Sequence, residues 1–267
     1  MIMNFEQPNS DYLNAYEQMV NNAPSALSAE VFDALSIPHL LSLTEEYRKA
    51  PVRVLVFGQE TYGVEARLAD MDTHSEDWLQ RAVKHAQDET AKFNFAVGSS
   101  AENSPFWIGY QEIVELFGLS GRQAVGWSNI VKVQTVATGS EGTRSISKFR
   151  AEEKGQVIQW QRDLLRAEIA YARPHLIVMF TGGLTWLARE TFRTKPWNAQ
   201  DCDLKMMPFD GLNENSGQMT APLLGDAITV YTYHPAALRT AEGKAMVRNH
   251  RHKVLTRAKE LIEATVG

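Results

Sequence analysis

Four short apolar runs divide this chain and limit the folds open to it. They occupy residues 52–57, 124–131, 175–180 and 227–233. Three of them are rich in β-branched residues, as expected of strands that are buried on both faces of a sheet. Helical patterns separate the runs, and this alternation predicts a parallel sheet covered by helices. We therefore predict a three-layer α/β/α fold with a central four-stranded parallel sheet.

The predicted helices have recognisable ends. Ser104 is a typical N-cap, Pro105 suits the first helical position, and Gly118 is a typical stop signal. Residues 1–50 predict two or three short helices, one of them after Pro38, in an N-terminal extension. The other expected helices span residues 77–91, 104–118, 147–172, 184–192 and from about 242 to the end.

Composition sets the broad class of the protein. At 267 residues with 44% apolar residues, the chain is expected to form a single domain over residues 1–267 with a substantial core. Cys202 is the only cysteine, so no intramolecular disulfide or thiolate metal cluster forms. The N-terminus resembles no signal peptide, and no apolar run reaches membrane-spanning length. We expect a cytoplasmic monomer without metal or cofactor, and without membrane contact.

Polar residues gather where the predicted strands end. "GQETYG" follows the first strand, Asn129 lies within the second, and His234 follows the fourth. Parallel sheets bind ligands beyond the carboxyl ends of their strands, so a carboxylate, an amide and an imidazole are expected at one edge. The nucleophile elbow of hydrolases, the P-loop and the Rossmann glycine spacing are all missing from the sequence.

These residues carry a resemblance to the uracil-DNA glycosylase superfamily. "GQETYG" resembles its first motif, Gly-Gln-Asp-Pro-Tyr-His, and "HPAALR" resembles its last, His-Pro-Ser followed by a leucine. Between them, "FNFAVGSSAENSPFWIGYQEIVEL" and "SNIVKV" resemble the family's base-stacking and base-reading segments. The match runs from about residue 52 to 260 with the motifs in order. It implies a monofunctional DNA glycosylase that flips a base out of DNA and hydrolyses its N-glycosidic bond.

The resemblance also implies roles for individual residues. Glu60 stands where the family activates water, Asn129 where it reads the base, and His234 where it faces the carbonyl O2 of the base. Gln59, Tyr62 and Phe95 would bind the base, with Tyr62 at its C5 edge and Phe95 stacked on it. The expected DNA contacts are Ser104, Leu238 as a wedge, Arg239, Lys244 and Arg248.

The chemistry is consistent with these roles. Breaking an N-glycosidic bond builds negative charge on the departing base and positive charge on the sugar. An imidazole donor stabilises the first, and a carboxylate stabilises the second and orients water. Residues 234–260 hold seven Lys/Arg against two Glu, which favours phosphate contact despite a net charge of −5. Each residue also has a purely structural reading, as a cap, a core aromatic or a solvated charge.

Departures from the family pattern bear on the substrate. Glu60 replaces the usual aspartate and extends the carboxylate by about 1.5 Å, while Gly63 and Ala236 replace the usual histidine and serine. A helical insert over residues 64–92 begins beside the C5 gate. We therefore expect either uracil or a bulky modified cytosine, the second implying defence against phage DNA. Two alternatives remain, namely a catalytically idle DNA-binding relative and a hydrolase of free nucleosides. His250 and His252 point to different helix faces, which disfavours a metal site.

Overall fold

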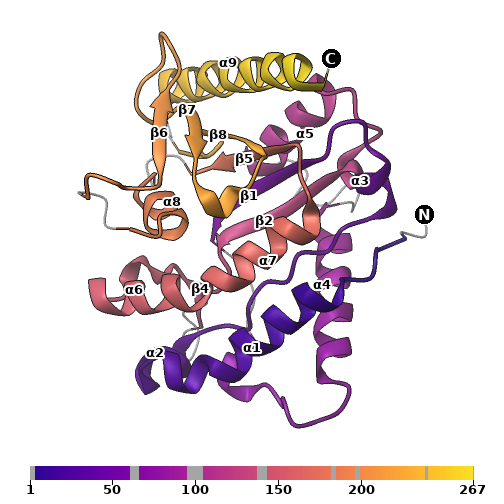
Figure 1. Ribbon diagram of the computed structural model, residues 1–267, viewed down its shortest axis with the longest axis vertical. Helices are drawn as coiled ribbons and strands as arrows, with labels where there is room; N and C mark the ends of the chain where they lie inside the picture. The colour runs from indigo at the N-terminus through magenta and orange to yellow at the C-terminus, as the bar shows by residue number, and fades with distance from the viewer. Residues whose placement is uncertain are drawn as a thin grey trace.

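The computed structural model describes residues 4–60, 66–94, 105–136, 143–181, 185–195, 199–237 and 240–266. Its centre is a six-stranded sheet in the order β2-β1-β5-β8-β7-β6 (Figure 1). The strands of this sheet are β1 (Val54–Glu60), β2 (Val125–Val131), β5 (Leu176–Phe180), β6 (Lys205–Pro208), β7 (Gly217–Thr220) and β8 (Ile228–Thr232). A separate two-residue pair joins β3 (Thr135–Val136) to β4 (Thr143–Arg144).

The prediction of an α/β fold is confirmed, but the observed sheet contains two strands that were not predicted. All four expected strands form and pair in parallel, as β2, β1, β5 and β8. An antiparallel hairpin, β6–β7, extends the sheet beyond β8. It lies in the polar segment between residues 194 and 226, where β6 is mostly exposed and β7 buries only Gly217 and Met219, so neither strand forms a long apolar run. The sheet is thus mostly parallel and has six strands where four were expected.

Alternating residues of the central strands feed two separate cores. In β1, Leu55 and Phe57 join a core with helices α1, α6, α7 and α8 on one face of the sheet. Val54 and Val56 join a second core with α5 and α9 on the other face. Figure 1 shows α5 and α9 on one side of the strands and α1, α6 and α7 on the other. Burial on both faces explains why β1 and β5 are continuous apolar runs.

The helices agree with the sequence pattern in most places. They are α1 (Ser10–Ala26), α2 (Ala29–Ala34), α3 (Glu45–Lys49), α4 (Trp78–Asn94), α5 (Pro105–Leu116), α6 (Ala151–Trp160), α7 (Arg162–Ala172), α8 (Thr185–Phe192) and α9 (Ala241–Val266). The helix expected within the 64–92 insert is α4, and its Trp78 stacks on Tyr16 of α1 with ring centroids 6.3 Å apart. No helix in the described ranges is long and apolar enough to span a bilayer.

The single long helix predicted over residues 147–172 is wrong. Two helices, α6 and α7, meet at Gln161, whose side chain is fully buried. Its Nε2 donates to the carbonyl of Ile130 at 2.7 Å, and its Oε1 accepts from the backbone N–H of Lys132 at 2.8 Å. Gln161 therefore binds the backbone of the outermost parallel strand, β2. The break lets this amide reach backbone groups that would otherwise be buried without partners.

The helix predicted directly after Pro38 begins later, at Glu45. The chain between α2 and α3 instead runs extended beside the residues that follow β2. Ser36 N–H donates to the carbonyl of Gln134 at 2.9 Å, and His39 N–H donates to the carbonyl of Lys132 at 2.7 Å. Unpaired backbone groups at the rim of a sheet favour this extended pairing over a helical turn.

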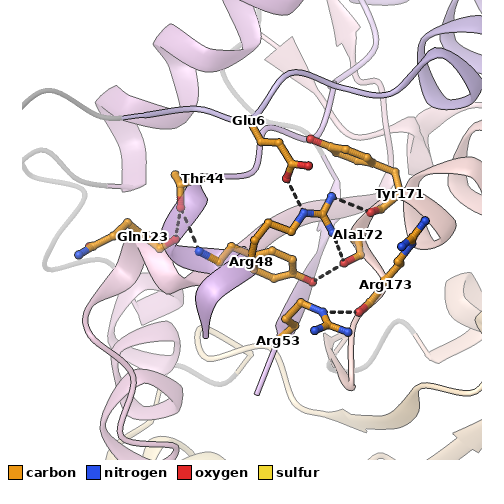
Figure 2. A network of polar contacts seen from close by, with 9 residues as sticks. Glu6, Thr44, Arg48, Arg53, Gln123, Tyr171, Ala172 and Arg173 are labelled. Atoms are coloured by element: carbon orange, nitrogen blue, oxygen red, sulfur yellow. Dashed lines mark hydrogen bonds and ion pairs between the residues drawn. The ribbon is translucent and has the colours of Figure 1, made fainter. Parts of the chain in front are cut away.

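The N-terminal region is also anchored at the end of α7 (Figure 2). Arg48 Nη1 donates to the carbonyl of Ala172 at 2.9 Å, and its Nη2 donates to that of Tyr171 at 2.8 Å. Glu6 forms an ion pair with the Nε of the same guanidinium. The last carbonyls of a helix lack partners within it, so Arg48 caps α7 and fixes the first fifty residues to the core.

Candidate functional site

Two strands meet closely at the carboxyl edge of the sheet. Gly58 of β1 is paired in register with Asn129 of β2. A Cβ atom on Gly58 would lie 2.5 Å from Asn129 Oδ1 and 3.5 Å from Phe106 Cε2. Real Cβ atoms do not approach an oxygen so closely, so only glycine leaves the amide its position. The first motif thus has a structural reason for its glycine.

Asn129 presents an amide donor that has no partner among the described residues. The side chain is only 3% exposed, and its Nδ2 has no hydrogen-bond partner among the described residues. A buried donor left unpaired costs about 1–3 kcal/mol. Such a cost is typical of groups that a ligand later satisfies. Asn129 is therefore the strongest candidate here for recognising a polar ligand edge.

Phe106 connects Asn129 to His234. Its ring lies beside Gly58, stacks on the imidazole of His234 with centroids 6.0 Å apart at 27°, and meets the ring of Phe180 edge-on at 5.9 Å. Phe106 is the second residue of α5 and is partly exposed. Phe106 thus lies close both to Gly58, the strand partner of Asn129, and to His234. Sequence reasoning assigned the stacking role to Phe95 and missed Phe106.

A tight turn holds His234 after β8. The backbone N–H of Ala236 donates to His234 Nδ1 at 3.1 Å. Because Nδ1 accepts, the proton of the neutral ring lies on Nε2, which is a donor. Pro235 packs against α5, where a Cβ on Gly109 would lie 2.7 Å from Pro235 Cγ. Glycine at that position therefore lets the turn approach the helix.

The electrostatics keep this imidazole neutral. Burial, and then the nearby guanidinium of Arg251, lower the pKa of His234 from 6.5 to about 4. Arg251 is itself 4% exposed, and its Nε donates to Glu112 Oε2 of α5 at 2.7 Å. At neutral pH the ring therefore offers a neutral N–H donor. Such a group can stabilise negative charge that develops on a ligand without transferring a full proton.

A buried charged network lies behind β2, on the face opposite Phe106. Lys132 Nζ contacts Ser128 Oγ and forms an ion pair with Glu168 of α7, and both charged side chains are fully buried. Tyr12 of α1 donates to the same carboxylate at 3.1 Å. Burial lowers the pKa of Lys132, and Glu168 opposes that shift. The network fixes the strand that carries Asn129. In the sequence, this network is indicated by a lysine that directly follows an apolar strand.

The remaining candidates vary in how far the structure describes them. Gln59 Nε2 donates to the carbonyl of Thr181 at 2.7 Å, so this amide joins the ends of β1 and β5. Glu60 ends β1 opposite Val131, and its side chain lies outside the described part. Lys244 and Arg248 are exposed on α9. The candidates that lie wholly outside the described residues are Tyr62, Phe95, Ser104, Leu238 and Arg239.

A groove of about 580 Å³ separates α5 from α9. Arg122, Arg248 and Arg251 line it, together with Ile108, which is 50% exposed. The groove lies beside the helix that carries Phe106 and Gly109. Glu112 and Glu115 line the groove as well, and Glu112 pairs with Arg251, so arginines and carboxylates together lie beside the strand-end cluster.

Comparison with known proteins adds no family to this description. No model of a known protein family matches the chain, and no curated protein sequence matches it. Within the described ranges, no group of three or more His, Cys, Asp or Glu side chains is arranged to hold a metal ion.

Proposed function

We propose that this chain is a monofunctional DNA glycosylase of the uracil-DNA glycosylase type, which extrudes a pyrimidine-type base and hydrolyses its N-glycosidic bond. One observation carries the proposal. The amide of Asn129, buried without a partner among the described residues, and the neutral imidazole donor of His234 both lie near the ring of Phe106, the first through Gly58 and the second by stacking. Amide recognition, charge stabilisation and stacking are the functions that such a reaction requires.

The base would bind through the amide of Asn129 and the ring of Phe106. An amide offers one donor and one acceptor, which match the O4 and N3–H of uracil. Satisfying Asn129 Nδ2 would recover the cost of its burial. Phe106 adds an aromatic surface between the two polar groups. Removing a base from the helical stack costs a few kcal/mol, which stacking and hydrogen bonding offset.

The proposed residues account for the electron pair and the proton that move when the N-glycosidic bond is cleaved. The electron pair of the C1′–N1 bond leaves with the base, whose O2 accepts a hydrogen bond from His234 Nε2–H. The oxygen of water attacks C1′, and Glu60 orients this water and accepts its proton. The base leaves as an anion and takes up a proton from solvent, Glu60 returns the water proton to solvent, and the products are the free base and an abasic sugar. DNA contacts are assigned to the basic surface of α9, including Lys244 and Arg248, whose attraction to phosphates is independent of base identity.

Two kinds of base are candidates for the substrate. Uracil fits the amide pattern directly. A modified cytosine would be read by the same amide in its flipped orientation, and the insert that contains α4 begins at the C5 side of the proposed pocket. Removal of such a base would act against phage DNA rather than in repair.

The test uses labelled oligonucleotides that contain uracil, thymine opposite guanine, or hydroxymethylated or glucosylated cytosine, followed by alkali to reveal abasic sites. Asn129→Ala, His234→Ala and Glu60→Gln are each expected to lower the excision rate by about 100-fold or more. Asn14→Ala and His74→Ala, at exposed positions, are matched controls and should keep the parent rate.

The outcomes separate the competing functions. Cleavage of one base, lost in the three variants and kept in the controls, supports the proposal. DNA retained on a gel without cleavage of any substrate favours an idle binder. Release of bases from free nucleosides alone favours a nucleoside hydrolase.

A further inference from the structure

A second basic groove lies on the opposite face of the sheet from Phe106. It runs between α6 and α8, which are neighbours in Figure 1, and has a volume of about 610 Å³. Lys154, Arg162, Arg193 and Lys195 line it, and Glu190 is the only carboxylate among its lining residues. Because the protein as a whole carries a charge of −5, this concentration of cations is a local feature.

Two guanidinium groups in the groove are close enough to repel one another. Burial lowers the pKa of Arg162, and the charges of Arg193 and Arg166 lower it further. The Nε atoms of Arg162 and Arg193 are buried and have no hydrogen-bond partner among the described residues. Arg162 Nη2 donates to the carbonyl of Glu190 at 3.1 Å, whereas no described residue pairs with its Nη1. Like charges held together with donors to spare favour an anion between them.

Glu190 offsets only part of this charge. It forms an ion pair with Arg193 Nη2, while Arg193 Nη1 donates to the carbonyl of Lys195 at 3.0 Å. Lys195 pairs with Asp201 at an exposed position, which contributes little in water. Arg162 therefore has no carboxylate partner among the described residues. The Nζ atom of Lys154 lies 5.5 Å from the centroid of the Trp186 ring.

Gly155 leaves the wall of the groove open. It lies inside α6, where glycine is less stable than alanine. A Cβ atom there would meet nothing within 4 Å, so no packing contact requires glycine. A helix-interior glycine without a structural reason, lining a cationic groove, leaves space for a ligand.

We propose that the groove between α6 and α8 is a second binding site, which takes a phosphate group through Arg162 and Arg193, with Lys154 beside it. Planar guanidinium groups bind phosphate oxygens in pairs, more strongly than neutral donors do. The phosphate can belong to a small phosphorylated ligand or to a nucleic-acid strand, and the chemistry at the groove is the same. The proposal does not depend on the glycosylase activity, because the two sites lie on opposite faces of the sheet.

Calorimetry at low salt tests the groove with two probes, inorganic pyrophosphate and an unmodified single-stranded oligonucleotide. Arg162→Gln and Arg193→Gln should each weaken binding by about tenfold, the loss expected for one charged hydrogen bond. Arg166→Gln, one turn along α7 at an exposed position, is the matched control and should bind like the parent protein. Binding of pyrophosphate but not of the oligonucleotide identifies a small ligand, and binding of both identifies a strand.

A steric variant tests the same site without removing charge. Gly155→Leu should keep the fold, because its side chain enters open space, and should abolish pyrophosphate binding. Failure of both probes to bind the parent protein would overturn the proposal, as would equal affinity in the parent, Arg162→Gln and Gly155→Leu proteins. Base excision, assayed separately, should be unchanged in these variants.

Discussion

Replacing Gly58 by alanine is the sharpest test of the strand-end cluster. The new Cβ would lie 2.5 Å from Asn129 Oδ1, and contacts below 3.0 Å are essentially never found for real Cβ atoms. The amide must therefore move by about half an ångström or more, or the two strands must separate. Because Asn129 is buried among packed side chains, the first response is the easier one and still strains the site.

The magnitude follows from two opposing effects. Overpacking of a core position costs about 1–3 kcal/mol, whereas replacing glycine in a strand returns about 0.5–1 kcal/mol. We expect Gly58→Ala to lower the free energy of unfolding by about 1–2 kcal/mol. Its effect on excision should be larger, because misplacing a reacting group by 1 Å costs about 100-fold, so half that shift costs about tenfold.

Urea unfolding and the oligonucleotide excision assay measure both effects. Gly155→Ala is the matched control, because its Cβ meets open space, and it should stabilise the fold by about 0.5–1 kcal/mol without changing excision. A Gly58→Ala protein with parental stability and parental excision rate would refute the contact between this glycine and Asn129, and with it the reasoning about the amide.

Three further predictions concern groups around the site. Lys132→Met should lower the free energy of unfolding by about 3–5 kcal/mol, because it leaves Glu168 buried and unpaired. Urea unfolding measures this loss, and a loss below about 1 kcal/mol would contradict the prediction. Stability should fall with acid, because His39 and His234 protonate at pKa values of about 3 and 4 in the folded protein and 6.5 when unfolded. The unfolded chain thus takes up protons first below pH 6.5, which costs about 3 kcal/mol for His234 alone, and a His234→Gln protein should lose less stability over that range. Gly109→Ala should push the turn after β8 away from α5, seen as a lower excision rate, and an unchanged rate would exclude a close fit of that turn.

The parallel part of the fold could be predicted because its signals are local. Short apolar runs such as residues 175–180 are typical of strands buried on both faces, and helical patterns between them favour a parallel sheet. The β6–β7 hairpin escaped prediction because each strand has only four residues, β6 is mostly exposed, and the buried positions of β7 are a glycine and a methionine, so no long apolar run marks it. The break at Gln161 also escaped, because it depends on backbone groups of β2 some thirty residues earlier in the chain.

The candidate site was predictable where a residue ends a strand and not where packing decides. Asn129 was identified as a polar residue within an apolar strand and His234 as one that follows a strand, and Phe106 stacks on His234 and lies near Gly58, the strand partner of Asn129. Phe106 itself was read only as a core aromatic, because its helical pattern does not reveal which ring faces the polar groups. Sequence reasoning did not identify Lys132, because only the three-dimensional contacts show that Glu168 is buried beside it.

The covering of β2 has a consequence for how molecules of this protein meet. Gln161 and the extended segment around Ser36 and His39 occupy backbone groups along the rim of the sheet next to the amide-bearing strand. A bare rim of this kind invites strand addition from another molecule, and hence aggregation. Shortening the chain to start near residue 52 would leave Gln161 in place and would free the backbone carbonyls of Lys132 and Gln134, and we expect such a shortened protein to self-associate more readily than the parent.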